Sequence, residues 1–96
     1  MLQMKQIAIL GSTGSIGTQA LDVISQHPDR FQVYCLTANN QVELLAEQAR
    51  KYNPDCVVIA NETHYERLCQ LLADRQDIKV YAGAKALDDV VEASTI

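Results

Sequence analysis

The sequence has no long apolar run and no excess of positive charge. Its first apolar stretch, Ile7 to Leu10, ends after four residues at Gly11, too short for a signal-peptide core and far too short for a membrane span. Asp and Glu number 12 against 8 Lys and Arg, a net charge of -4, which disfavours phosphate backbones and anionic lipid. We therefore expect a cytoplasmic protein with small-molecule ligands and no nucleic-acid or membrane partner.

Closely spaced cysteine pairs are also missing. Cys35, Cys56 and Cys69 are odd in number, lie in apolar runs and show no Cys-x-x-Cys spacing. This usage fits neither a disulfide framework nor a zinc site, so we expect small buried hydrophobic residues.

The chain has no linker, repeat or low-complexity segment; short apolar runs instead alternate with amphipathic stretches of helical length. That alternation is typical of repeated β-α-β units. The predicted strands cover residues 6–10, 31–36, 56–59 and 78–81. Pro28 and Pro54 end the first two helices, and Asn61 is a suitable N-cap for the third. The predicted apolar helix positions are Ile16, Ala20, Val23 and Ile24; Val42, Leu45, Ala46, Ala49 and Tyr52; Tyr65, Leu68, Cys69 and Leu72; and Ala86, Leu87, Val90 and Val91.

Ninety-six residues suffice for one small domain. Right-handed crossovers predict an α/β, Rossmann-like parallel sheet of about four strands, most simply in the order 3-2-1-4, with helices on both faces. Because a doubly wound domain needs two such halves, this fold is incomplete. We expect residues 1–96 to be the N-terminal part of a dinucleotide-binding domain, with the catalytic and C-terminal domains outside this chain.

The most informative motif is Gly-Ser-Thr-Gly-Ser-Ile-Gly at residues 11–17, between a predicted strand and a predicted helix. A dinucleotide fingerprint occupies this position. Gly11 allows a sharp turn, Gly14 leaves room for a pyrophosphate, and Gly17 lets the helix pack closely on the strand. The alternative is that the glycines only make a tight connection.

Free N–H groups at the start of the helix favour an anion. Ser12, Thr13 and Ser15 add hydroxyls that can donate to phosphate oxygens. No Gly-Lys-Ser/Thr is present, which excludes a P-loop for nucleoside triphosphates. The turn therefore predicts a site for the diphosphate of a dinucleotide.

The end of the second strand, Thr37-Ala38-Asn39-Asn40, predicts the cofactor. NAD-specific domains carry an acid here that bonds the ribose 2′-hydroxyl, whereas the first acid after this strand is Glu43. Asparagine amides donate to a phosphate without repelling it, which favours NADP(H), although the usual arginine is absent. The alternative is that Asn39 and Asn40 form a turn and cap the next helix.

Several features then occur in one register: GSTGSIG, Leu21-Asp22-Val23-Ile24, His27-Pro28, Phe31-x-Val33 and Leu36-x-Ala38-x-Asn40. Together they resemble the opening of 1-deoxy-D-xylulose 5-phosphate reductoisomerases, closely over about the first sixty residues and in pattern beyond them. The family often has Gly-Lys-Asn in the last segment, from which this chain departs at Ala38 and Asn39.

The resemblance implies an NADPH-dependent reductoisomerase of non-mevalonate isoprenoid biosynthesis, acting with a divalent metal (Mg, Mn or Co) on 1-deoxy-D-xylulose 5-phosphate. It implies a homodimeric parent whose metal-binding and catalytic residues lie beyond Ile96. The cofactor-binding positions predicted by the motifs and the resemblance are Gly11, Thr13, Gly14, Ser15, Ile16 and Gly17 for the pyrophosphate, and Ala38, Asn39 and Asn40 near the adenosine 2′-phosphate.

No catalytic residue and no metal site is predicted within this chain, since its histidines and carboxylates lack metal-ligand spacing. Structural roles are expected for His27, His64, Asp88 and Asp89. Two alternatives remain open. One is another NADP-dependent reductase, such as an aspartate-semialdehyde dehydrogenase or an extended short-chain dehydrogenase; the other is a non-enzymatic module that senses NADP(H).

Overall fold

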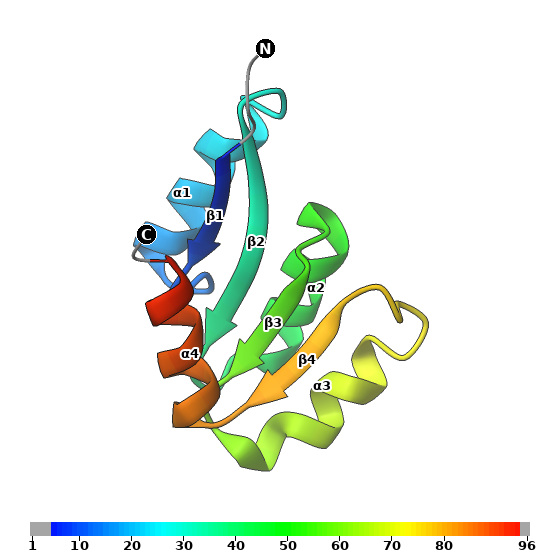
Figure 1. The fold of residues 1–96 in the computed structure, drawn as a ribbon. Coiled ribbons are helices and arrows are strands. Elements are labelled where there is room, and N and C mark those ends of the chain that lie inside the picture. The colour runs from blue at the N-terminus through cyan, green and yellow to red at the C-terminus, as the bar shows by residue number, and fades with distance from the viewer. Residues whose placement is uncertain (1–4, 95–96) are drawn as a thin grey trace.

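A computed structural model describes residues 5–94, with side-chain surroundings through Val90. All strands of the sheet are parallel and end at one edge, the lower edge in Figure 1. The elements in chain order are β1 (Lys5–Ile9), α1 (Ser15–Ser25), β2 (Phe31–Ala38), α2 (Val42–Tyr52), β3 (Cys56–Ile59), the 3-10 helix η1 (Glu62–His64), α3 (Tyr65–Leu71), β4 (Lys79–Ala82) and α4 (Ala84–Ser94).

The predicted alternation of strands and helices is confirmed, with limits that shift by one or two residues. The second strand continues beyond Leu36 to Ala38, and α2 ends before Asn53, whose left-handed φ of 53° closes the helix. Asn61 is an N-cap, as predicted, although it caps η1, where its side chain accepts from the Thr63 N–H.

The predicted strand order 3-2-1-4 is wrong: the order is β1-β2-β3-β4. All three crossovers add the next strand on the same side of the previous one, because α3 lies on the same face of the sheet as α1 and α2. Leu68 of α3 and Leu72 just after it join the core formed by those helices. A right-handed crossover on that face places β4 outside β3, so the direction does not reverse there.

Helix α4 covers the opposite face, so helices lie on both faces as predicted. It packs against β1, β3 and β4 and crosses the front of the sheet in Figure 1. Its Val90 joins a smaller core with Cys35, Cys56 and Val58. The predicted role of Val91 concerns a side chain outside the described part. The larger core includes Leu21, Leu36 and Leu45, each contributing about 1.5–3 kcal/mol by burial.

The buried side of α1 differs from the predicted set. Gly17, Leu21 and Ile24 face the sheet, whereas Ile16 and Val23 are 84% and 55% exposed. The helix is rotated toward Gly17 because only a residue without a side chain fits against the strand end there.

The cysteines behave partly as predicted. All three are free thiols; Cys35 and Cys56 are buried and Cys69 is half-buried. Cys35 and Cys56 are register partners on β2 and β3. The neighbouring Cys56 thiol, and then burial, raise the pKa of the Cys35 thiol well above its ordinary value.

Candidate functional site

The glycine turn joins β1 to α1 at the edge where the strands end. Each of its three glycines has a different structural role. Gly11 has a φ of 69°, so its backbone conformation favours glycine. A Cβ on Gly17 would lie 2.4 Å from the Gly11 carbonyl oxygen and 2.7 Å from the Ser12 Cα. Gly17 is therefore required for the close approach of helix and strand.

Gly14 is not required by the protein itself. Its φ of -80° and ψ of 173° suit any residue, and a Cβ there would meet only the Gly11 carbonyl oxygen, at an ordinary 3.4 Å. The missing side chain instead leaves space on the outer side of the turn.

The amides of the turn divide into two groups. The N–H groups of Gly11 and Ser12 donate to Thr37, at 2.9 Å to its hydroxyl and 2.8 Å to its carbonyl, and that of Gly14 donates to Gly11. Within residues 5–94, no hydrogen bond uses the remaining N–H groups of the turn. These belong to Thr13, Ser15, Ile16 and Gly17.

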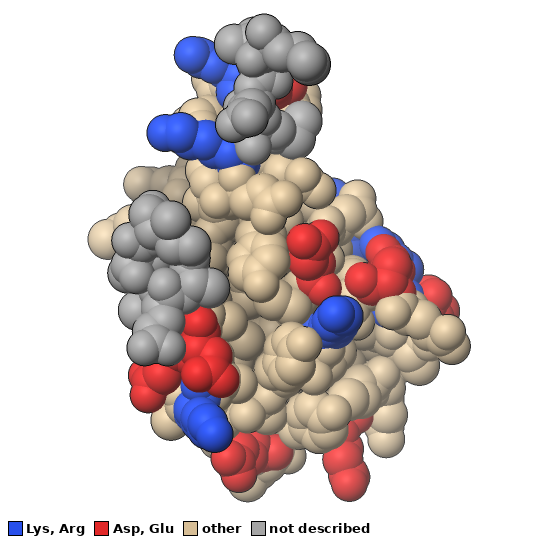
Figure 2. Space-filling model, viewed as in Figure 1, with Lys and Arg blue, Asp and Glu red and all other residues tan. Residues whose placement is uncertain are grey.

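These free donors lie at the positive end of α1. The N-cap Gly14 offers no side-chain bond, and the first turn of the helix has no acidic residue. Such an end attracts an anion by about 0.3–1 kcal/mol, and by up to about 2 kcal/mol when partly buried. Among the described residues, no basic side chain lines the space beside the turn, and Figure 2 shows mostly acidic groups along the lower edge of the face in view.

A hollow of about 580 Å³ opens beside the turn. Exposed Ile16 and Leu10 form part of its wall, and none of the described residues that line it is charged. Its lining residues are Ala8, Ile9, Leu10, Gly11, Gly14, Ser15, Ile16, Gly17 and Ala20. The arrangement offers backbone N–H groups to an anion and apolar surface to the group attached to it.

The second predicted segment lies at the end of the neighbouring strand. Ala38 is buried, while Asn39 and Asn40 are exposed. The carbonyls of Ala38 and Asn39 accept from the N–H groups of Ala60 and Asn61, at 2.8 and 3.0 Å. Neither asparagine side chain caps α2, whose N-cap Gln41 makes no side-chain bond. The capping half of the alternative is therefore wrong, whereas the turn is present, since the Asn40 carbonyl accepts from the Val42 N–H at 2.7 Å.

The predicted role of Ser12 is wrong. Its side chain is 0% exposed, and its Oγ donates to Gln48 Oε1 at 2.7 Å, so it cannot donate to a phosphate outside. Gln48 Nε2 in turn donates to the Ser12 carbonyl at 2.8 Å. Sequence reasoning missed Gln48 because a polar residue within an apolar helix stripe resembles a surface position.

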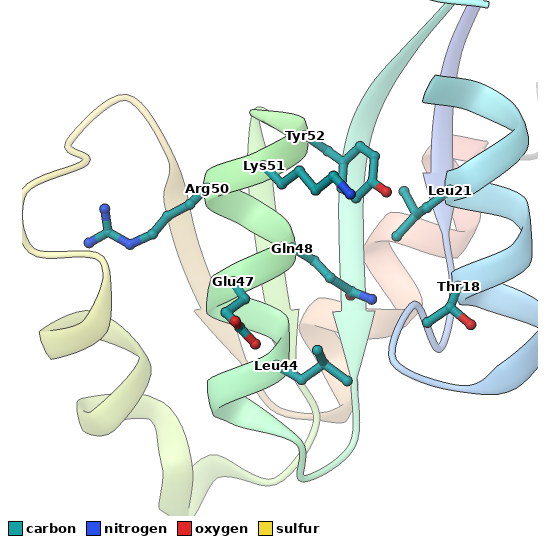
Figure 3. Close-up of a pocket in the computed structure, with 8 residues that line it drawn as sticks. All are labelled: Thr18, Leu21, Leu44, Glu47, Gln48, Arg50, Lys51 and Tyr52. Carbon is teal, nitrogen blue, oxygen red and sulfur yellow. The ribbon is translucent and has the colours of Figure 1, made fainter. Parts of the chain in front are cut away.

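A second hollow, of about 560 Å³, lies between α1 and α2 (Figure 3). Its polar side chains do not converge: Arg50 points away from it and bonds Asp74 and the Leu71 carbonyl, and the Lys51 ammonium lies 5.3 Å from the ring centre of Tyr52. Its lining residues are Thr18, Leu21, Leu44, Glu47, Gln48, Arg50, Lys51 and Tyr52. It lacks the convergent polar groups of a ligand site.

Within residues 5–94, His, Cys, Asp and Glu side chains do not gather in threes or more as a metal site requires. None of the helices in this range has the length and apolar character needed to cross a bilayer.

A parallel sheet covered on both faces, with a glycine turn after its first strand, defines a Rossmann-like α/β fold. Residues 7–96 match the family model of 1-deoxy-D-xylulose 5-phosphate reductoisomerase. The chain belongs to this family.

Relatives with that name agree over almost the whole chain. The Phocaeicola vulgatus protein is 64% identical over 92 residues, which cover 96% of this chain and 24% of that protein. The Bacteroides fragilis protein is 60% identical over 95 residues, 99% of this chain and 24% of that protein. The chain therefore spans about a quarter of the length of the curated relatives it matches.

Solved structures agree as well. The reductoisomerase of Zymomonas mobilis in complex with NADPH is 41% identical, with a TM-score of 0.85 over 91% of this chain and 23% of that one. A reductoisomerase in complex with NADPH, fosmidomycin and magnesium is 30% identical, with a TM-score of 0.87 over 97% of this chain and 23% of that one.

Proposed function

We propose that residues 1–96 form the N-terminal part of the NADP(H)-binding domain of a 1-deoxy-D-xylulose 5-phosphate reductoisomerase. The complete enzyme would convert 1-deoxy-D-xylulose 5-phosphate to 2-C-methyl-D-erythritol 4-phosphate in non-mevalonate isoprenoid biosynthesis. The role of NADPH in this reduction would be to supply the hydride. The high identity to relatives of that name supports the proposal.

One observation carries the cofactor assignment: within residues 5–94, four N–H groups at the start of α1 have no hydrogen-bond acceptor, and they lie next to Gly14, where the fold itself would accept a side chain. We assign the pyrophosphate to the segment from Gly11 to Gly17, with Thr13, Gly14, Ser15 and Ile16 nearest to it. A diphosphate accepts several N–H bonds at once, which suits this set of donors.

We assign the adenosine 2′-phosphate to the segment Ala38-Asn39-Asn40. The two exposed asparagines supply uncharged donors, and buried Ala38 contributes backbone only. Without lysine or arginine in this segment, the preference for NADPH over NADH rests on hydrogen bonds rather than ion pairing.

The chain itself supplies cofactor binding and no chemical step in this proposal. The metal ligands (for Mg, Mn or Co), the catalytic residues and the sugar-phosphate site would belong to the remainder of the enzyme, which we propose to be a homodimer. The free thiols of the described chain fit a reducing compartment, and we propose the cytoplasm.

The test is a fluorescence titration of NADPH into the protein expressed from its complete reading frame. Binding in the micromolar range, about -8 kcal/mol, with weaker binding of NADH is expected. A reading frame several-fold longer than 96 codons is also expected. A frame that ends near Ile96 would favour the sensing module, and a folded protein that ignores NADPH would refute the assignment.

A further inference from the structure

Gln48 and Ser12 form a reciprocal pair in the core, 36 positions apart in sequence. The Ser12 hydroxyl donates to Gln48 Oε1 at 2.7 Å, and Gln48 Nε2 donates to the Ser12 carbonyl at 2.8 Å. Ser12 is 0% exposed and Gln48 7%. In Figure 3 the side chain of Gln48 extends from α2 toward the side of α1.

The bond to the Ser12 carbonyl fixes the orientation of one peptide unit. A trans peptide is planar, and its C=O and N–H point in opposite directions; no peptide within residues 5–94 is cis. Because Gln48 holds the carbonyl toward the core, the N–H at the other end of the same unit points away from it. That N–H belongs to Thr13 and is one of the four unpaired donors of the turn.

Thr37 fixes the peptide that precedes Ser12. It accepts the N–H groups of Gly11 and Ser12, so the orientation of the peptide before Ser12 is set by β2. The peptide after it is held by α2 through Gln48. Two separate elements thus hold the first half of the turn before any ligand arrives.

We propose that Gln48 is a positioning residue for dinucleotide binding: it holds the Ser12–Thr13 peptide so that the Thr13 N–H is presented to the diphosphate. This inference rests on the proposed function and adds to it a residue outside the turn. Preorganised donors bind an anion more tightly than donors that must be ordered on binding. Glutamine suits the role because one side chain both accepts from the hydroxyl and donates to the carbonyl.

The experiment uses Gln48→Met and Gln48→Glu in the protein expressed from its complete reading frame. Methionine keeps the length of the side chain and removes both bonds, whereas an ionised glutamate keeps the acceptor and loses the donor. Gln19→Glu adds the same charge on the exposed side of α1 and is the matched control. Thermal unfolding of each variant identifies those that fold.

Two ligands separate positioning from general damage. NADPH contains the diphosphate, and adenosine 2′-monophosphate contains the 2′-phosphate without it. We expect Gln48→Met to weaken NADPH binding about tenfold and to leave the affinity for adenosine 2′-monophosphate within about twofold. Gln48→Glu should be at least as weak toward NADPH, and Gln19→Glu close to wild type.

Unchanged NADPH affinity in folded Gln48→Met overturns the inference, and so does an equal loss for both ligands, which would indicate a purely structural role. A folded wild-type protein that binds no NADPH has a different meaning: it refutes the proposed function, and this inference with it. If Gln48→Glu does not fold, the comparison of the two ligands in Gln48→Met decides alone.

Discussion

Asn61 Nδ2 donates to Asn40 Oδ1 at 2.7 Å, which joins the loops that follow β3 and β2. The Asn61 oxygen accepts from both the N–H and the hydroxyl of Thr63, at 3.1 and 2.7 Å. Because its oxygen is engaged, Asn61 must turn its NH₂ group toward Asn40. Asn40 therefore presents its oxygen to Asn61 and keeps its own NH₂ group as a donor.

Asn61→Asp should reverse this arrangement. A carboxylate still accepts from Thr63 but cannot donate to Asn40, so the Asn40 amide turns its NH₂ group inward and its oxygen outward. We expect about tenfold weaker NADPH binding with little change for NADH, measured by fluorescence titration of both cofactors. Equal affinities in variant and wild type would show that Asn40 does not contact the 2′-phosphate.

Asn39→Asp should shift the cofactor preference toward NADH. The carboxylate repels a 2′-phosphate and accepts a hydrogen bond from a 2′-hydroxyl. A change of about tenfold to a hundredfold in the ratio of the two dissociation constants is expected. Asn53→Asp makes the same charge change at the end of α2 and serves as the control. Equal loss for both cofactors would mean that Asn39 is structural.

Gly14→Val should abolish dinucleotide binding and leave the fold largely intact. The side chain would enter the proposed path of the pyrophosphate, while inside the protein its Cβ meets only ordinary contacts. The changed N-cap costs about 1 kcal/mol at most. Circular dichroism and NADPH titration measure the two effects, and Gly14→Ala should give an intermediate affinity. A folded valine variant with normal affinity would contradict the pyrophosphate assignment.

Gly17→Ala should destabilise the protein itself. Its Cβ would lie 2.4 Å from the Gly11 carbonyl oxygen, and backbone atoms on both sides cannot move apart without shifting α1. Overpacking costs about 1–3 kcal/mol, more than the roughly 1 kcal/mol that alanine gains as a helix former. Chemical denaturation should show a clear loss in Gly17→Ala and little in Gly14→Ala. Equal stabilities would mean that α1 can shift without cost.

Asp74→Asn should lower stability slightly at neutral pH and not in acid. Hydrogen bonds from Arg50 hold the pKa of Asp74 below its ordinary value. Stability from a depressed carboxyl pKa is present above the unfolded-state value and is lost as pH falls through the folded-state value. Both side chains are largely exposed, so the effect is small.

Thermal unfolding of wild type and Asp74→Asn at about pH 7 and about pH 2 measures this difference. Asp29→Asn is the control, since Asp29 makes no ion pair among the described residues. A gap between wild type and Asp74→Asn that widens in acid would contradict the assignment of the pair.

Local patterns predicted much of the fold, because strand and helix positions depend on neighbouring residues. The apolar run at Cys56 to Ile59 and the end of the second helix before Pro54 needed no distant partner. Strand order does depend on distant partners. Leu68 and Leu72 fit a helix on either face of the sheet, and only their packing with α1 and α2 sets the position of β4.

The candidate site was likewise predictable where local sequence decides a residue's role, and not where a distant contact decides it. Gly11 and Gly17 were identifiable because each performs a backbone task that glycine does best, and Gly14 because its place in the motif predicts an open path for a ligand. Ser12 was not, since a hydroxyl in a turn can face a ligand or the core, and a helix 36 residues later decides which. Gln48 gave no signal of its own before the turn was placed beside it.

The two loops of the proposed cofactor site share one anchor, because Thr37 holds the glycine turn through both its hydroxyl and its carbonyl and immediately precedes Ala38 and Asn39. Their separation is set by the backbone of β2 and not by the ligand. Under the proposed function, an adenine nucleotide would be selected by the span between its 5′- and 2′-phosphates as well as by its charge. A molecule with a different span would engage one loop at a time.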